Sequence, residues 1–220
     1  ILKIYTKDPE FRFFMSIQIL LIVACTLVMI SHQYFDSSWQ DFEQVVFQAV
    51  SISTTTGYTT SNFAEWPSFV PMLLIIASFI GGCAGSVGGG LRVARILVLY
   101  LQGARELKRF VHPNLVYPIK WGQNVLDERV IGSIWAFFSA YLLVFTICLL
   151  SVIACGVEPF DAFNAVLASI NNLGPGLGSV SSNMTAMPDS AKWILTIAMV
   201  CGRLEIFTLL ALFTPAFWKA

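Results

Sequence analysis

The chain has 220 residues, of which 56% are hydrophobic and only 12% are charged. Soluble domains have about 25% charged residues, so this composition excludes most soluble classes and fits a bilayer instead. The 13 lysines and arginines equal the 13 aspartates and glutamates, so no basic field is left for a nucleic-acid partner, and the apolar content excludes a disordered chain.

Four stretches are apolar enough to be membrane helices, which need about 18 or more such residues. They are residues 13–35, 66–91, 130–157 and 193–218, and the last is interrupted only by Arg203 and Glu205. The first stretch lacks a small-residue cleavage site after it, so it is not predicted to be a signal peptide. The chain starts at Ile1, and we expect it to be part of a longer protein.

Two further charge-free runs, 44–64 and 162–188, begin as apolar helical patterns and then become rich in small and polar residues. In lipid such a break leaves amide groups unpaired, so it must line a cavity or pack against protein. Each run is therefore predicted to be a short helix entering the membrane, followed by a loop that leaves on the same side.

The charges agree with a chain that runs helix, re-entrant hairpin, helix, and then repeats this order. Segments 1–12, 92–129 and 219–220 then lie on one side with 11 of the 13 basic residues. Segments 36–65 and 158–192 lie on the other side, where Lys192 is the one basic residue. Basic segments stay in the cytoplasm, so both hairpins are expected to face outward.

The two halves match when Gly57 is aligned with Gly174, which lays residues 54–59 over residues 171–176. Potassium filters bind the dehydrated ion with backbone carbonyls, and glycine adopts the required dihedrals at low strain. A Tyr such as Tyr58 can brace such a loop from behind. The predicted ion-binding residues are Thr55, Thr56, Gly57, Tyr58, Asn172, Leu173, Gly174 and Pro175, with potassium itself at Thr55, Thr56, Gly57, Asn172, Leu173 and Gly174.

The sequence thus predicts an all-α membrane protein with two helix–pore-loop–helix repeats of the potassium-channel type. The first repeat spans 1–110, with a filter loop at 54–59, and the second spans 111–220, with a filter loop at 171–176. Residues 81–90 contain six glycines, and each costs a helix roughly 1 kcal/mol relative to alanine. We expect the second helix of the first repeat to break there, although close helix packing through small residues is the alternative.

Arg203 and Glu205 are charges deep in a predicted span, where charge is costly and usually functional. Two residues apart on a helix they lie on nearly opposite faces, so they are not expected to neutralise each other. We expect Arg203 to face the pore near 81–90, where it repels cations or holds the segment shut, and Glu205 to pair with another part of the protein. A structural ion pair with a missing helix is the alternative.

Four motifs together resemble the Trk/Ktr/HKT family of potassium transporters, in particular its TrkH branch, over nearly the whole chain. They are Ser53–Tyr58, Asn171–Gly178, Gly81–Ser86 and Gly202–Glu205. The resemblance implies four repeats, of which this chain holds the C-terminal two. It also implies a multi-pass protein of the bacterial inner membrane, filter loops outside, a homodimer, and an intramembrane gate. The gate residues would be Gly81, Gly82, Gly85, Gly88, Gly89, Gly90, Arg203 and Glu205.

Residues 91–110 carry several basic side chains among apolar ones. Anionic lipid headgroups are one partner for such a segment. The resemblance implies another, a cytosolic TrkA-like nucleotide-binding regulatory ring.

The chain is not expected to be an enzyme or to need a cofactor, with potassium as its substrate. Gly85-Ser86 lacks a base within reach for a serine protease, since neither histidine falls in mid-membrane. Two other classes stay open: an ion-coupled secondary transporter with re-entrant hairpins, and a structural membrane subunit. The first predicts more ionisable residues at mid-depth, and the second has no need of a Thr-Thr-Gly-Tyr loop.

Overall fold

A computed structural model describes residues 8–35, 39–86, 88–113, 117–122, 124–181, 183–212, 214 and 218, and these are mostly helical. The α-helices are α2 (Pro9–Ser31), α3 (Trp39–Ser53), α4 (Phe69–Ala77), α5 (Val93–Val111), α6 (Glu128–Ala154), α7 (Pro159–Ile170), α8 (Asp189–Arg203) and α9 (Ile206–Leu212). Short 3-10 turns lie at η1 (Phe63–Glu65) and η2 (Gly178–Val180). Strands β1 (Lys120–Trp121) and β2 (Asn124–Val125) form a small antiparallel hairpin between α5 and α6.

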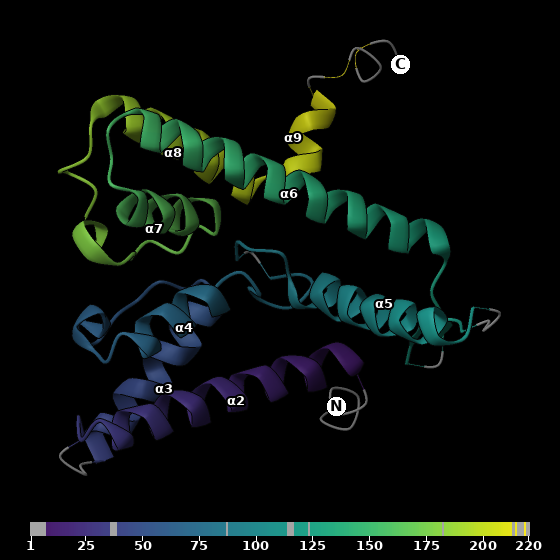
Figure 1. Ribbon diagram of the computed structural model, residues 1–220, viewed down its shortest axis with the longest axis horizontal. Helices are drawn as coiled ribbons and strands as arrows, with labels where there is room; N and C mark the ends of the chain where they lie inside the picture. Colours follow the sequence, from purple (N-terminus) through teal and green to yellow (C-terminus); the bar gives the residue numbers. More distant parts are fainter. Residues whose placement is uncertain are drawn as a thin grey trace.

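The helices form two groups that lie one above the other (Figure 1). In one group α2 packs on α3, α4 and α5, and in the other α6, α7 and α8 pack together. Helix α5 also contacts α6, and this contact connects the two groups at one end. The non-helical residues that join α4 to α5 run between the two groups (Figure 1).

Two helices of the described chain are long and apolar enough to cross a membrane, α2 and α6. Both begin at an aspartate cap: Asp8 accepts the N–H of Glu10, and Asp127 accepts the N–H of Arg129. Such a cap satisfies an amide that the first helical turn leaves unpaired. The predicted spans 13–35 and 130–157 are each one unbroken helix as far as Ser31 and Ala154, and their last three or four residues lie beyond the helix ends.

The other two predicted spans are interrupted. Helix α4 ends at Ala77 and α5 begins at Val93, while α8 ends at Arg203 and α9 begins at Ile206. Arg203 and Glu205 therefore do not share a helix, and the expectation that they lie on opposite faces of one helix is wrong. The reason is local: Glu205 has a φ of 58°, which no α-helical residue adopts.

The short helix α7 carries few charges and is mostly buried. Eight of its 12 residues are buried, whereas only 22% and 28% of the apolar windows of α2 and α6 are buried. Apolar side chains such as Leu20 and Leu143 remain exposed on the long helices. A short helix that enters a membrane without crossing it must be surrounded by protein, and the burial of α7 is compatible with the predicted re-entrant hairpin.

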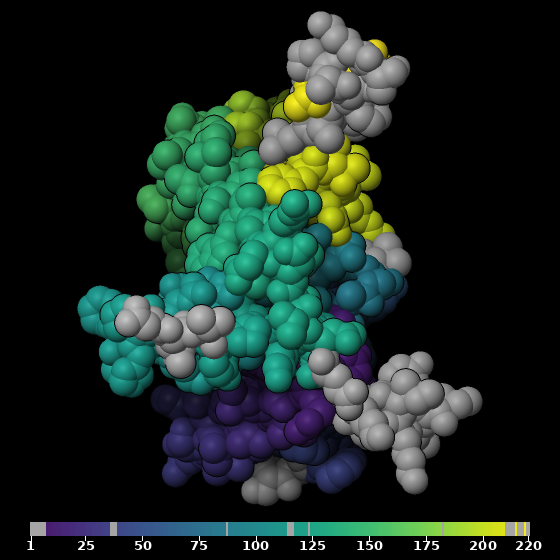
Figure 2. Space-filling view, turned by 90° about the vertical axis from the view of Figure 1, so that its right-hand side faces the viewer, coloured from purple at the N-terminus to yellow at the C-terminus, as the bar shows by residue number. Residues whose placement is uncertain are grey.

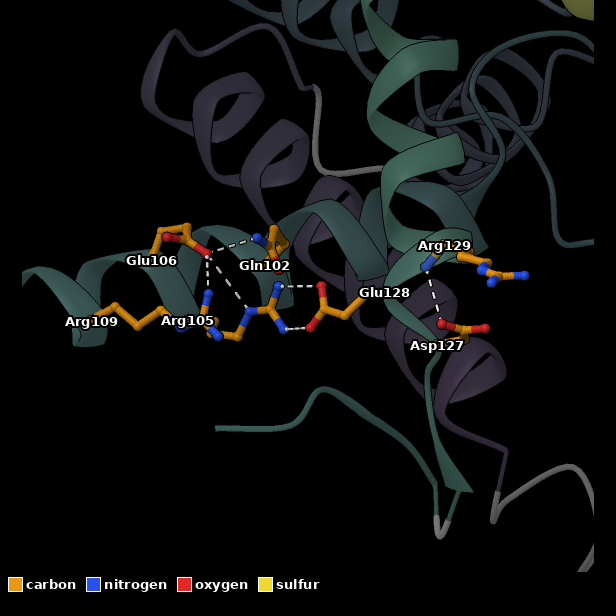
Figure 3. Close-up of polar contacts among 7 residues, drawn as sticks. All are labelled: Gln102, Arg105, Glu106, Arg109, Asp127, Glu128 and Arg129. Atoms are coloured by element: carbon orange, nitrogen blue, oxygen red, sulfur yellow. Dashed lines mark hydrogen bonds and ion pairs between the residues drawn. The ribbon is translucent and has the colours of Figure 1, made fainter. Parts of the chain in front are cut away.

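The end of α5 is tied to the start of α6 by a buried arginine. Arg105 is 2% exposed, and its two terminal nitrogens donate to the two carboxylate oxygens of Glu128 at 2.5 and 3.1 Å (Figure 3). This hydrogen-bonded carboxylate raises the pKa of the Arg105 guanidinium above its ordinary value. Gln102 and Arg109 both donate to Glu106 beside it. Figure 2 views the molecule from this end, where α5 and α6 lie between α2 and α9.

Candidate functional site

The loops after α3 and α7 leave their helices in the same way. The N–H of Thr55 donates to the carbonyl of Ile52 at 3.1 Å, and at the aligned positions the N–H of Asn172 donates to Ser169 at 3.0 Å. One residue further on, the N–H groups of Thr56 and Leu173 each reach back five residues, both at 2.9 Å. The two loops share only the glycine of Thr-Thr-Thr-Gly and Asn-Asn-Leu-Gly, yet they adopt the same backbone hydrogen-bond pattern.

The dihedral angles repeat as well. Thr55 and Asn172 have φ of 57° and 52°, and the aligned Gly57 and Gly174 have φ of 81° and 96°. Positive φ is ordinary for glycine and tolerated by asparagine, but it is an outlier for a β-branched residue such as threonine. Strained backbone of this kind persists only where neighbouring groups hold it, which is common at functional sites.

The two loops touch each other. A Cβ placed on Gly57 would lie 2.0 Å from the carbonyl oxygen of Leu173, so a side chain has no room there. An open cavity of about 740 Å³ lies against the contact, lined by Gly57, residues 59–63, Gly174, Pro175 and Ser181. The eight residues predicted to bind potassium therefore lie in two adjacent loops.

Other contacts fix the loops from outside. The hydroxyl of Ser51 donates to the carbonyl of Tyr58 at 2.6 Å, and the amide of Asn172 donates to the carbonyl of Met199 on α8 at 3.2 Å. Tyr58 is 74% exposed within the described part of the chain. Its role as a brace behind the loop stays a prediction.

Residues 78–92, which we call the glycine-rich segment, lie against both loops. The N–H of Gly89 donates to the hydroxyl oxygen of Thr55 at 3.0 Å. A Cβ on Gly89 would lie 1.9 Å from the carbonyl oxygen of Asn171, the first residue of the second loop. Positive φ at Gly81, Gly85 and Gly90 explains why the segment is not helical.

The glycine-rich segment is closed at its base and held at its tip. Leu91 donates its N–H to Phe79 at 2.9 Å, and Val93 donates to Gly82 at 3.1 Å, so the two arms run together. At the tip the carboxylate of Glu10 accepts the N–H of Ala84 at 2.5 Å. Glu10 is a residue that sequence reasoning missed, because it lies 74 positions away and resembles an ordinary first-turn acid of a helix.

Glu205 pairs with two arginines from the other group of helices. Its carboxylate oxygens lie 2.6 Å from Arg92 and 2.8 Å from Arg95, and the three side chains are between 22% and 31% exposed. Arg92 and Glu205 are the residues before α5 and α9, and both have positive φ. The pair therefore joins the two chain breaks, and it supplies the partner that the sequence left unidentified. Arg203 is an exposed residue at the last turn of α8.

Several basic side chains of α5 already form ion pairs or ring contacts within the chain. Arg95 also lies over the ring of Phe137, 4.0 Å from its centre, and Arg105 is buried against Glu128. Lys108 lies over Tyr117, and Arg109 pairs with Glu106. Fewer of these charges are thus available to lipid or to a partner than the sequence suggests.

Some predicted features lie outside the described residues. These are Val87 inside the glycine-rich segment, residues 1–7, and residues 219–220 at the other end. In the part of the chain that is described, no group of three or more His, Cys, Asp or Glu residues is arranged to hold a metal ion. The polar groups of the two loops are backbone amides and carbonyls, threonine hydroxyls and the side-chain amides of Asn171 and Asn172.

Comparisons with known proteins agree on one group. Residues 4–220 match the family described as TrkH, cation transport protein. The Trk system potassium uptake proteins TrkH of Vibrio parahaemolyticus and of Escherichia coli K12 are each 56% identical over 218 residues, which is 99% of this chain and 45% of each relative. TrkG of Escherichia coli K12 is 34% identical over 223 residues.

A solved structure is similar too. The crystal structure of the potassium transporter TrkH from Vibrio parahaemolyticus superimposes with a TM-score of 0.91 at 57% identity, covering 97% of this chain and 46% of that one. The chain spans about half the length of the curated relatives it matches.

Proposed function

Because this chain belongs to the TrkH family of cation transport proteins, we propose that it forms half of a potassium uptake pathway. Family membership makes it a membrane protein, and α2 and α6 are compatible with membrane crossing. The relatives are named as potassium uptake proteins, and we extend that substrate to this chain. The single observation that carries the proposal is the repeated loop backbone, with matching positive φ at aligned positions.

The two loops act as half of an ion filter. Carbonyl oxygens replace the hydration shell of potassium, and the hydroxyls of Thr55 and Thr56 add further oxygens. A ring of ligands requires carbonyls that do not alternate in direction as they do in an extended chain. The positive φ at Thr55, Gly57, Asn172 and Gly174 breaks that alternation. Two further repeats of the full-length protein complete the ring.

Each half of the chain is a helix–pore-loop–helix repeat. The buried position of α7 supports its role as a pore helix that enters the membrane without crossing it. The excess of basic residues on one side of the predicted topology supports an outer-face position for the cavity beside Gly57 and Gly174. The protein then lies in the bacterial inner membrane with its filter loops outward.

The glycine-rich segment is the gate below the filter. Its contacts with Thr55 and Asn171 support an obstructing position, and glycine gives it the freedom to move. Glu10 holds its tip, and the Glu205 pairs fix the helix starts beside it. A homodimer and a cytosolic TrkA-like ring that acts on α5 complete the proposed assembly, with lipid around it.

Uptake of rubidium by the full-length protein in liposomes tests the function. We expect rubidium and potassium to enter faster than sodium. A passive pore does so without a proton gradient. Dependence on a coupled ion gradient would favour the secondary-transporter alternative, and absence of any uptake would favour a structural subunit.

Replacing Arg203 by alanine is expected to raise potassium flux about fivefold. If removing the charge lowers the energy barrier for a passing cation by roughly 1 kcal/mol, the size of a Coulomb interaction across many ångströms at an effective dielectric constant of about 20, the flux rises by a factor of about five. Flux is measured in liposomes beside Arg203→Lys, which keeps the charge and should keep the low flux. Equal flux in the alanine variant and the unsubstituted protein would remove Arg203 from the gate.

A further inference from the structure

Asn171 is the first residue of the second filter loop, and it is completely buried at the end of α7. Each side of its amide has a partner on a different helix. The hydroxyl of Tyr141 on α6 donates to Oδ1 at 2.7 Å. Nδ2 donates to the hydroxyl oxygen of Ser78, at the end of α4, at 3.0 Å.

The hydrogen bonds run in one direction. The hydroxyl of Ser78 donates to the carbonyl of Ile75 at 2.6 Å, so the order of donation is Tyr141, Asn171, Ser78, Ile75. We call the three side chains Tyr141, Asn171 and Ser78 the buried bridge. All three are buried, and a buried amide that loses one partner carries the full penalty of the unpaired group. The bridge therefore acts as a unit.

The buried bridge holds both arms of the glycine-rich segment. Ser78 is the residue at which that segment leaves α4. Gly89, on the returning arm, packs against the backbone carbonyl of Asn171. The ring of Phe79 also meets the ring of Tyr141 edge-on, with centres 6.2 Å apart.

Within the described residues, the side chain at the aligned position of the first loop bonds only to its own helix end and loop. Thr54 corresponds to Asn171, and its hydroxyl donates to the carbonyl of Val50 in its own helix at 2.7 Å. The bridge is thus a feature of the second repeat, reaching across to the second helix of the first repeat. Local helix-end chemistry does not account for it, because it joins residues 30 and 93 positions apart.

From these contacts we propose that Asn171 is a positioning residue, which couples the second filter loop to the glycine-rich segment through Tyr141 and Ser78. This inference rests on the proposed function of the loop and the segment. When the bridge is intact, it holds the backbone of Asn172 and the two arms of the segment in fixed positions relative to each other. When it is broken, both filter and gate lose their alignment together.

The test uses Tyr141→Phe and Ser78→Ala in the full-length protein, each removing one hydroxyl from the bridge. Ser139→Ala is the matched control, because the hydroxyl of Ser139 lies exposed on the same helix as Tyr141 and, among the described residues, donates to the carbonyl of Trp135 in its own helix. Flux per folded transporter and the ratio of potassium to sodium uptake are both measured. Each bridge variant should change flux at least threefold and lower the ratio at least threefold, and Ser139→Ala should change neither.

A double variant checks that the residues act together. Tyr141→Phe combined with Ser78→Ala should change the ratio by no more than the larger single change, since one break already disables the bridge. If the unsubstituted protein fails to take up potassium, the proposed function itself is wrong. If it transports and the bridge variants behave like Ser139→Ala, or lose only the yield of folded protein, the positioning role is overturned.

Discussion

Gly57→Ala is expected to abolish most of the discrimination between potassium and sodium, lowering the uptake ratio at least about tenfold. Two effects add at this position. A residue with a Cβ is strained at positive φ by about 1–2 kcal/mol, and Gly57 has a φ of 81°. The new Cβ would also lie 2.0 Å from the carbonyl oxygen of Leu173, whereas real Cβ contacts essentially never fall below 3.0 Å. Because both partners are backbone, the two loops must separate.

The chain supplies two controls that divide these effects. Gly174 has a φ of 96° but open space where its Cβ would lie, so Gly174→Ala adds strain without a clash. Gly103, within α5, has open space and no positive φ, so Gly103→Ala adds neither. Potassium and sodium uptake should show the largest loss of selectivity for Gly57, a smaller loss for Gly174 and none for Gly103. Equal ratios in all three variants would contradict the filter.

The sequence predicted the parts of this site that local chemistry determines. Glycine and threonine crowd into 54–59, and six glycines crowd into 81–90, so loops and a break could be expected without a structure. Aligning Gly57 with Gly174 also anticipated which positions share a backbone conformation. Such features depend on a few consecutive residues, and for that reason they are visible in the order of the residues.

The remaining contacts were hidden because they join distant residues. Glu10 and Ala84 are 74 positions apart, and Arg95 and Glu205 are 110 positions apart. The break after Arg203 also carries no ordinary signal, since Leu204 and Glu205 are both compatible with a helix. Close packing shows why the chain is constrained there: a Cβ on Gly202 would lie 1.8 Å from the carbonyl oxygen of Ile170. A non-glycine residue at positive φ, such as Glu205, is decided by tertiary contacts.

The second large effect is expected for Gly89→Ala, which should raise potassium flux in the absence of any regulator. Its Cβ would lie 1.9 Å from the carbonyl oxygen of Asn171. One of the two backbones must yield, and Asn171 is held at both sides of its amide, so the glycine-rich segment should move away from the filter. Overpacking of this kind costs about 1–3 kcal/mol, and a penalty confined to the closed state shifts the equilibrium toward opening by roughly five- to 150-fold.

Gly85→Ala is the control within the same segment, since Gly85 has a φ of 90° but nothing near its Cβ position. It adds strain without pushing on the filter, so its flux should rise less than that of Gly89→Ala. Measuring flux and the potassium-to-sodium ratio together separates two mechanisms. Higher flux with an unchanged ratio means that the segment obstructs an intact filter. A fall in the ratio without higher flux would mean that the clash deforms the filter instead, and the segment would then be a support for the loops and not their gate.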